Sequence, residues 1–554
     1  MVKNRLLQWG SIAAGALFLL VSNIWYINAT FHTIPGYRFT GANPYASADK
    51  LVYQSMVEQG REGIIFMRNL HTTEPQKGLL LSPLWFAIGQ TAYIVNVSNN
   101  AAYQSFRILF TLLFLWMLYQ LLTKLFRRSS DRFFSLLVVL FSGGLGWLYL
   151  LRHFDVIQTS GLFKFLYSPI DLYVTEGNTL LNFSQSPLFA LSQLLLLLIF
   201  YWFIRDAKAN SYGRYFLVAA LVALLGVLHP YDLPVIAAVL GSWSIWYLYQ
   251  TKDFKILIKL AIVLVGMAAA AGYTVYVFFA EPVMQEWYKQ NLVYSPSLIN
   301  FLWGYGFLIP LWITGVIVLM RTKRRDSWWM LILIWSTIIW ILLYTPLNIN
   351  RRFMNGWHIA LALVSYSGLR YLYEQCKRLW LKTALVSASI VGLLSGIVFY
   401  LFISLYFTPA TYALGYYYVT INEDKAIAYL RAHTVRNDGL LTSDMKLAFR
   451  LSSSLNRPVF RGHDHQTPRY QLKQQQMDWF FSEHETARAG ERKRQFLKDN
   501  NIAYVVVSQV SLGRPVLWLS GADFLEQVAE YGDILIFRVQ GFEGVSRQTP
   551  SQDF

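Results

Sequence analysis

Apolar stretches recur along the first 410 residues, and this pattern constrains the fold more than any other feature of the sequence. Most of them reach about 18 residues, the length of a helix that crosses a bilayer. They lie near residues 7–27, 106–125, 133–151, 187–204, 215–229, 233–249, 257–279, 301–320, 327–345, 353–371 and 383–407. Charged residues make up only 14% of the 554, against about a quarter in soluble proteins. The sequence therefore predicts an α-helical polytopic membrane protein with about eleven transmembrane helices.

The basic residues predict how the chain is oriented in the membrane. If the N-terminus is cytoplasmic, the short inner loops hold 19 Lys and Arg and the short outer loops hold five. This asymmetry fits the positive-inside rule. It also accounts for most of the net charge of +17 without a nucleic-acid partner. We expect a multi-pass protein of the plasma membrane, whose odd number of spans places the C-terminal segment on the extracytoplasmic face.

Two outer segments are too long to be simple linkers. The first loop covers about residues 28–105, and the second segment follows the last span. In the second, apolar runs typical of strands alternate with helical patterns. The strands are expected at 439–442, 503–508 and 534–537, and the helices at 423–432, 469–481 and 487–500. We therefore predict a transmembrane domain over residues 1–410 and a small extracytoplasmic α/β domain over residues 411–554.

Ionisable residues in the first loop are candidates for chemistry. Ser47 is typical of a helix N-cap, which would place Asp49 in the first turn and Tyr53 on the same face. Glu74 precedes a proline in an extended stretch. Asp49 could equally serve only to stabilise the helix N-terminus, and Glu74 could be solvated in the loop.

Three further polar groups lie at the predicted outer ends of spans. Arg351 and Arg352 interrupt the positive-inside pattern, and a guanidinium suits phosphate, although it could also reach lipid headgroups. His229 and Asp232 stand in a proline-rich turn that does not require them. Glu176 belongs to a polar loop that leads into the span at 187–204. Each group could also be an incidental part of its loop.

Metal binding has weak support in the sequence. The single cysteine, Cys376, excludes a disulfide framework and a cysteine-rich metal site. His463 and His465 stand two residues apart, but no third ligand can be identified beside them. No cofactor is assigned, and assistance by a divalent metal ion stays open.

The architecture resembles that of the C-type (GT-C) superfamily of integral-membrane glycosyltransferases, which includes protein O-mannosyltransferases and bacterial aminoarabinose lipid transferases. The local resemblance lies at Asp49 with Tyr53, Glu74, His229-Pro230 and Arg351-Arg352-Phe353. It is greatest to uncharacterised bacterial members. The adjacent Asp-Glu pair common in protein O-mannosyltransferases is absent, because Lys50 follows Asp49.

The resemblance implies a polyprenyl-phosphate-linked sugar as donor and a glycan, lipid or protein acceptor on the outer face. No glycine-rich nucleotide-binding loop is found, which agrees with a lipid-linked donor. In the expected reaction Asp49 is the general base, and Arg351 or Arg352 stabilises the leaving phosphate. Glu74 is a candidate catalytic residue together with Asp49, and it would orient the donor or the acceptor. Tyr53, Glu176, His229 and Asp232 would contribute to substrate binding.

Two other functions remain compatible with the sequence. A transporter or lipid flippase could use the outer acids for proton or cation coupling, but those acids cluster in loops and no inverted repeat is found. A non-catalytic envelope scaffold could bind glycan through its outer domain. Such a scaffold would need neither Asp49 nor the two arginines.

Overall fold

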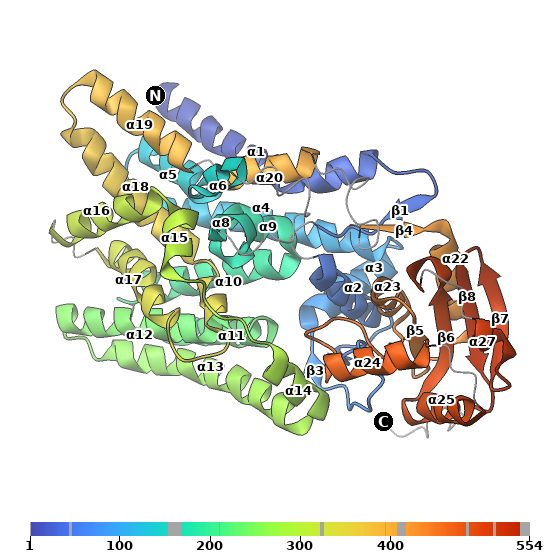
Figure 1. Ribbon diagram of the computed structural model, residues 1–554. Coiled ribbons are helices and arrows are strands. Elements are labelled where there is room, and N and C mark those ends of the chain that lie inside the picture. Colours follow the sequence, from blue (N-terminus) through green and yellow to red (C-terminus); the bar gives the residue numbers. More distant parts are fainter. Residues whose placement is uncertain are drawn as a thin grey trace. The chain divides into compact units, whose positions relative to one another are not determined.

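The computed structural model describes residues 2–43, 47–152, 169–209, 211–321, 326–393, 395–406, 417–482, 487–512 and 517–542 (Figure 1). The chain divides into two compact units. Unit 1 comprises Met1–Asn28, Gln104–Thr274 and Leu292–Phe407. Unit 2 comprises Ala29–Tyr103, Val275–Asn291 and Thr408–Phe554. The predicted boundary at 410–411 thus lies near one of the breaks, and the first long loop packs with the C-terminal part of the chain.

Unit 1 is built of helices, most of which coincide with the predicted apolar stretches (Figure 1). The long helices are α1 (Val2–Phe31), α4 (Asn99–Leu125), α5 (Ser129–Phe141), α10 (Pro187–Arg205), α11 (Gly213–Leu228), α12 (Asp232–Thr251), α13 (Lys255–Ala280), α16 (Leu308–Arg321), α17 (Ser327–Leu342), α18 (Trp357–Gln375), α19 (Leu379–Leu393) and α20 (Ser395–Tyr406). The short ones are α6 (Gly146–Arg152), α8 (Ile170–Tyr173), η2 (Thr175–Gly177), α9 (Thr179–Gln185), α15 (Leu298–Tyr305) and η3 (Asn350–Met354).

Five helices in the described part of the chain are long and apolar enough to cross a membrane. They are Arg5–Phe31, Asn99–Leu125, Ser129–Tyr149, Pro187–Arg205 and Lys255–Ala280. Helices α15 and α16 would form a sixth span with a 90° bend. Gly306 lies at this bend with φ of 44°, a conformation that glycine adopts without steric cost. A mostly helical chain with several such helices is confirmed, while the count of eleven spans stays a prediction.

Helix α18 lies at the centre of unit 1, where it packs against α16, α17 and α5. Small residues allow the closest of these approaches. A Cβ atom on Gly368 would lie 2.0 Å from the Leu311 carbonyl oxygen, and one on Gly315 would lie 2.1 Å from the Val364 carbonyl oxygen. Helices α16 and α18 are therefore in backbone contact, and the two glycines are required for it.

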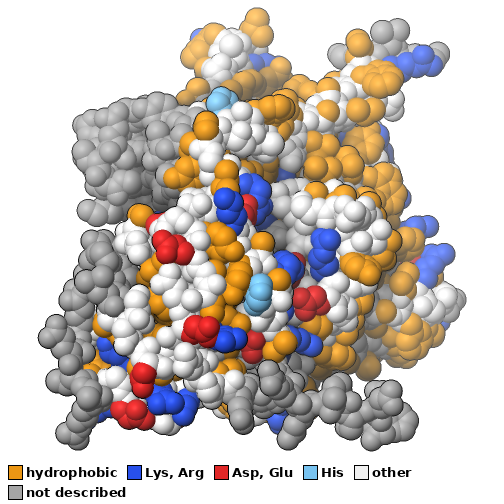
Figure 2. All heavy atoms as spheres, turned by 90° about the vertical axis from the view of Figure 1, so that its right-hand side faces the viewer, with side chains coloured by type: hydrophobic (Ala, Val, Ile, Leu, Met, Phe, Trp, Pro, Cys, Tyr) orange, Lys and Arg blue, Asp and Glu red, His pale blue; other side chains and the backbone are white. Residues whose placement is uncertain are grey.

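Unit 2 joins the first long loop to the C-terminal part of the chain. Strand β1 (Tyr37–Phe39) pairs antiparallel with β4 (Tyr418–Thr420), and β2 (Phe66–Met67) pairs with β3 (Leu80–Leu81). The loop also carries α2 (Ser47–Arg61) and α3 (Pro83–Ile94), and α14 (Pro282–Gln290) belongs to the same unit. On the face seen in Figure 2, acidic and basic side chains lie interspersed with hydrophobic ones.

A four-stranded sheet organises the C-terminal part of unit 2. Its strands are β5 (Gly439–Thr442), β6 (Ile502–Ser508), β8 (Ile534–Val539) and β7 (Leu525–Tyr531), in that order, with β5 parallel to β6 and the others antiparallel. The accompanying helices are α22 (Ile421–His433), α23 (Met445–Leu455), α24 (Tyr470–Phe480), α25 (Ala487–Asp499), α26 (Gln509–Leu512) and α27 (Leu517–Gly521). Strand β7 and helix α23 were not expected from the sequence.

Every residue of β6 is buried, because helices cover both faces of the sheet. Phe480 of α24 and Leu497 of α25 pack on one face. Leu430 of α22 and Leu447 of α23 pack on the other. This layered core holds the connecting loops of unit 2 in place, and one of those loops carries His463.

Candidate functional site

In unit 1 a buried polar loop carries Glu176. Asn178 caps helix α9, because its side-chain oxygen accepts hydrogen bonds from the Leu180 and Leu181 amides. The Asn178 side-chain amide in turn donates to the Ser142 carbonyl oxygen at 3.0 Å. Tyr305 donates to the Gly177 carbonyl oxygen at 2.9 Å. Contacts on both sides of Glu176 therefore hold its backbone, and the side chain is 4% exposed.

Arg352 lies beside Glu176. Its Nη1 is 3.6 Å from Glu176 Oε1, and its guanidinium lies over the Tyr231 ring at 4.8 Å. Burial by itself raises the pKa of Glu176, but the charges of Arg351 and Arg352 bring that pKa below its ordinary value. Arg351 Nε is buried and has no hydrogen-bond partner among the described residues. Two cations, Arg351 and Arg352, thus lie near one carboxylate, that of Glu176. They are brought together by η3, the turn before α12 and the loop that carries Glu176.

The turn between α11 and α12 adds a second buried polar group. His229 Nδ1 lies 3.0 Å from Asp232 Oδ2, and both side chains are at most 4% exposed. Asn355 donates to both Asp232 oxygens, at 3.0 and 3.1 Å, and also to Ser192. Asn182 donates to the Asn355 side-chain oxygen at 3.1 Å. Side chains from around α9, α10 and η3 therefore hold Asp232 in place. A simple turn would not need these contacts.

In unit 2 Asp49 lies in the first turn of α2, where the sequence placed it. Its Oδ1 is 3.2 Å from Nε2 of His463, a residue 414 positions further along the chain. The other ring nitrogen of His463 is 2.9 Å from Asp464 Oδ1. One imidazole therefore contacts two carboxylates. The Asp49 side chain is half exposed, whereas that of His463 is buried, so solvent can reach Asp49 but not its partner.

The two carboxylates determine the charge of His463. Burial by itself lowers its pKa, but the hydrogen bonds to Asp464 and Asp49 raise the pKa of His463 to about 9. His463 is therefore an imidazolium at neutral pH. The neighbouring His71 is its opposite, since burial and the positive charge of His463 lower the His71 pKa to about 3. The His463 amide donates to His71 Nδ1 at 3.3 Å, which agrees with a neutral His71 ring.

The remaining two first-loop residues make other contacts. Glu74 Oε1 is 2.9 Å from Arg469 and 3.0 Å from Lys473, and these two cations bring the Glu74 pKa below its ordinary value although burial opposes them. The Tyr53 ring stacks on Trp85, with 4.7 Å between the ring centroids. Glu74 thus fastens the first loop to the start of α24, and Tyr53 packs on α3.

Among the described residues, no group of three or more His, Cys, Asp or Glu is arranged to hold a metal ion. The two histidines that suggested a metal site have different surroundings. Both ring nitrogens of His463 contact carboxylates, and the exposed His465 donates its backbone amide to Asp464 Oδ1 at 2.9 Å.

Sequence reasoning missed His463 as the partner of Asp49, and it missed Asn178, Asn182 and Asn355 in unit 1. Each of these residues stands in a segment that the sequence singled out, but a polar residue in a loop carries no signal of its distant partner. Their roles follow from contacts between segments that lie far apart in the chain.

This chain is similar to known proteins in its fold. No protein-family model matches the chain, and no curated protein matches it. Two solved structures of the oligosaccharyltransferase AglB of Archaeoglobus fulgidus are similar: the apo form (TM-score 0.51, 11% identity) and a complex with an inhibitory peptide and a dolichol-phosphate (0.52, 12%). Each match covers 90% of this chain and 69% of the other.

ArnT from Cupriavidus metallidurans, solved with bound undecaprenyl phosphate, is similar over almost the whole of both chains. The TM-score is 0.51 with 12% identity, and the match covers 96% of this chain and 98% of ArnT. AglB and ArnT, an aminoarabinose transferase, are both C-type glycosyltransferases. The resemblance inferred from the sequence is thereby confirmed in the fold: this chain has the fold of the C-type integral-membrane glycosyltransferases.

Proposed function

We propose that this protein is a glycosyltransferase that moves a sugar from a polyprenyl-phosphate donor to an acceptor hydroxyl on the extracytoplasmic face of the membrane. Two fold neighbours support this donor class, since one was solved with undecaprenyl phosphate and the other with a dolichol-phosphate. In this proposal residues 1–410 form the transmembrane domain, and residues 411–554 form the extracytoplasmic domain. The N-terminus is cytoplasmic.

The observation that carries the proposal is the pair of partly buried arginines in unit 1, Arg351 and Arg352. Arg351 has a buried Nε donor that no described residue satisfies, and Arg352 is held at 3.6 Å from Glu176. A buried donor without an acceptor is costly, and a phosphate would supply the acceptor oxygens. As the bond between the anomeric carbon and the phosphate oxygen breaks, negative charge grows on the phosphate. The two arginines stabilise that charge, while Glu176, His229 and Asp232 orient them and the donor.

Asp49 is the general base of the proposed reaction. Its half-exposed carboxylate takes the proton from the acceptor hydroxyl, whose oxygen then bonds to the anomeric carbon as polyprenyl phosphate leaves. A positioned base of this kind contributes about 10²–10⁴-fold to a rate. Glu74 and Tyr53 hold the first loop that carries Asp49, through Arg469, Lys473 and Trp85.

The test uses proteoliposomes that hold the purified full-length protein. They are offered a panel of radiolabelled polyprenyl-phosphate sugars, with an envelope extract as the source of acceptor. Asp49→Asn and Arg351→Gln are compared with Arg492→Gln, a matched substitution at an exposed position on α25. We expect label to leave the lipid with the wild type and Arg492→Gln. We expect a loss of about 10²-fold or more in Asp49→Asn.

The outcomes separate the proposed roles. Unchanged transfer by a folded Asp49→Asn protein would remove the general-base role. Unchanged donor affinity and rate in Arg351→Gln would remove the phosphate role of that residue. Movement of intact lipid or solute across the bilayer, with no sugar released, would replace the transferase with a transporter or flippase.

A further inference from the structure

Unit 2 contains a cavity of about 580 Å³ that the proposed transfer reaction does not use. Its walls come from β1, α2, the start of α4, α22 and α23. On α2 it is lined by Gln54, Glu58 and Arg61, which share one face of the helix at spacings of four and three residues. Asp49 points from a different face of α2, since 49 and 54 are about 140° apart around the helix. The volume falls within the range of roughly 300–1,000 Å³ that is usual for small-molecule sites.

More positively charged than negatively charged side chains line the cavity. Four arginines line the cavity, and three of them are paired with carboxylates: Arg38 with Asp424, Arg431 with Glu58 and Arg450 with Glu423. The fourth, Arg61, donates to two neutral oxygens, the Val97 carbonyl at 2.9 Å and Asn99 Oδ1 at 3.2 Å. Among the described residues no carboxylate forms an ion pair with Arg61. A guanidinium in this position suits a carboxylate or a phosphate of a ligand.

A second observation also indicates a ligand. Gln54 is 7% exposed, and its side-chain nitrogen Nε2 is buried with no hydrogen-bond partner among the described residues. A buried donor of this kind is rare unless water or a ligand satisfies it. The nearby lining supplies further amides and hydroxyls, including Asn100, Ser98 and Ser454, and the aromatic ring of Phe39. Sugar hydroxyls both donate and accept, so amides and hydroxyls of this kind can bind them.

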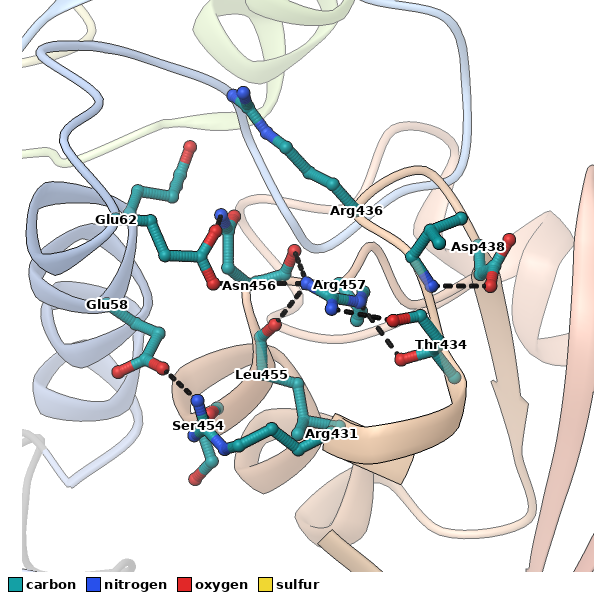
Figure 3. A network of polar contacts seen from close by, with 12 residues as sticks. Glu58, Glu62, Arg431, Thr434, Arg436, Asp438, Ser454, Leu455, Asn456 and Arg457 are labelled. Carbon is teal, nitrogen blue, oxygen red and sulfur yellow. Dashed lines mark hydrogen bonds and ion pairs between the residues drawn. The ribbon is translucent and has the colours of Figure 1, made fainter. Parts of the chain in front are cut away.

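Ion pairs and hydrogen bonds join residues on one side of the cavity, as Figure 3 shows. Arg431 of α22 reaches Glu58 of α2 at 2.7 Å and also the Ser454 carbonyl at the end of α23. Behind this wall Arg457 donates to both oxygens of Thr434 (Figure 3). Three lining residues, Glu58, Arg431 and Ser454, are therefore already joined to one another in the absence of a ligand.

We infer that this cavity binds a glycan segment that carries an acidic group, with Arg61 contacting the carboxylate or phosphate and Gln54 a hydroxyl. This binding goes beyond the proposed transfer, because it needs neither a lipid-linked donor nor Asp49. A negative result in the transfer assay would therefore not contradict glycan binding in the cavity. Absence of glycan binding would likewise not contradict the proposed transferase activity.

Binding is measured on the full-length protein in detergent with three probes. The first is a tetrasaccharide of alternating glucuronate and N-acetylglucosamine. The second is the neutral tetrasaccharide of N-acetylglucosamine, and the third is inorganic phosphate. We expect the acidic tetrasaccharide to bind at least about tenfold more tightly than either of the others. Arg61→Gln should weaken it about tenfold or more, as is usual for a charged hydrogen bond, while Arg492→Gln should not.

A second variant guards against misfolding of Arg61→Gln. Ser454 is half-buried on the cavity wall and contributes its backbone carbonyl to Arg431, so Ser454→Trp keeps that contact and fills the space with an indole ring. It should also abolish binding of the acidic tetrasaccharide. The inference is overturned if the folded wild type does not bind this probe, or if both variants bind it as the wild type does. It is also overturned if phosphate alone binds as tightly, which would indicate a simple anion site.

Discussion

Replacement of His463 tests the link between the C-terminal part of unit 2 and Asp49. In the folded protein the pKa of His463 is about 9, against 6.5 for an ordinary histidine, because Asp464 and Asp49 stabilise its charge. This difference corresponds to about 3 kcal/mol in favour of the folded state. Because the folded-state pKa is the higher one, the contribution is fully present below pH 6.5 and is lost as the pH rises through 9. His463→Gln removes it while retaining a polar side chain of similar length.

The assay is thermal unfolding in detergent between pH 6 and 10, followed for the wild type and for His463→Gln. One kcal/mol shifts Tm by roughly 2–4 °C in a unit of 150–250 residues, so the wild type should exceed the variant by about 6–12 °C at pH 6. This gap should shrink as the pH rises from 6.5 to 9 and should be nearly closed at pH 10. Other groups that titrate in this range are common to both proteins and cancel in the difference.

The matched control is His465→Gln, which changes an exposed histidine two residues away. Its Tm should follow that of the wild type at every pH. A gap between the wild type and His463→Gln that stays constant from pH 6 to 10 would refute the reasoning, because it would show loss of packing without loss of a stabilised charge.

Two further predictions concern unit 1. Asp131→Asn should destabilise the protein by about 2–3 kcal/mol, because the buried carboxylate accepts from Tyr366 at 3.0 Å and pairs with Arg370 at 2.6 Å; an unchanged unfolding midpoint would contradict this. Gly368→Ala should lower Tm, because the new methyl would meet a backbone oxygen 2.0 Å away. Gly241→Ala, with open space around it, should leave Tm equal or higher through its better helix propensity, and equal behaviour of the two would refute the packing argument.

Local patterns predicted much of the fold. Apolar stretches of span length coincide with helices of unit 1, and strands β5, β6 and β8 lie where β-type runs were found. Strand β7 was missed because its sequence, Leu-Glu-Gln-Val-Ala-Glu-Tyr, is half exposed and rich in polar residues. It is a strand through its pairing with β8, which a local pattern does not contain.

The candidate site was predictable only in part. The first-turn position of Asp49 follows from Ser47 and the helical period that comes after it, so the sequence alone was sufficient. That Glu176 would lie beside Arg352 could not be derived, because 176 positions separate them and nothing local specifies the pairing. The same is true of the amides Asn182 and Asn355, which meet around Asp232.

The sequence by itself determined which segments are apolar helices, which loops carry charge, and that Asp49 starts a helix. These properties depend on periodicity and composition within about twenty residues. Only the tertiary structure decided that His463 would be the charged partner of Asp49 and that Arg61 would line a cavity whose described carboxylates pair with other arginines. Both results depend on long-range packing, which sets burial and neighbours and hence the charge of a side chain.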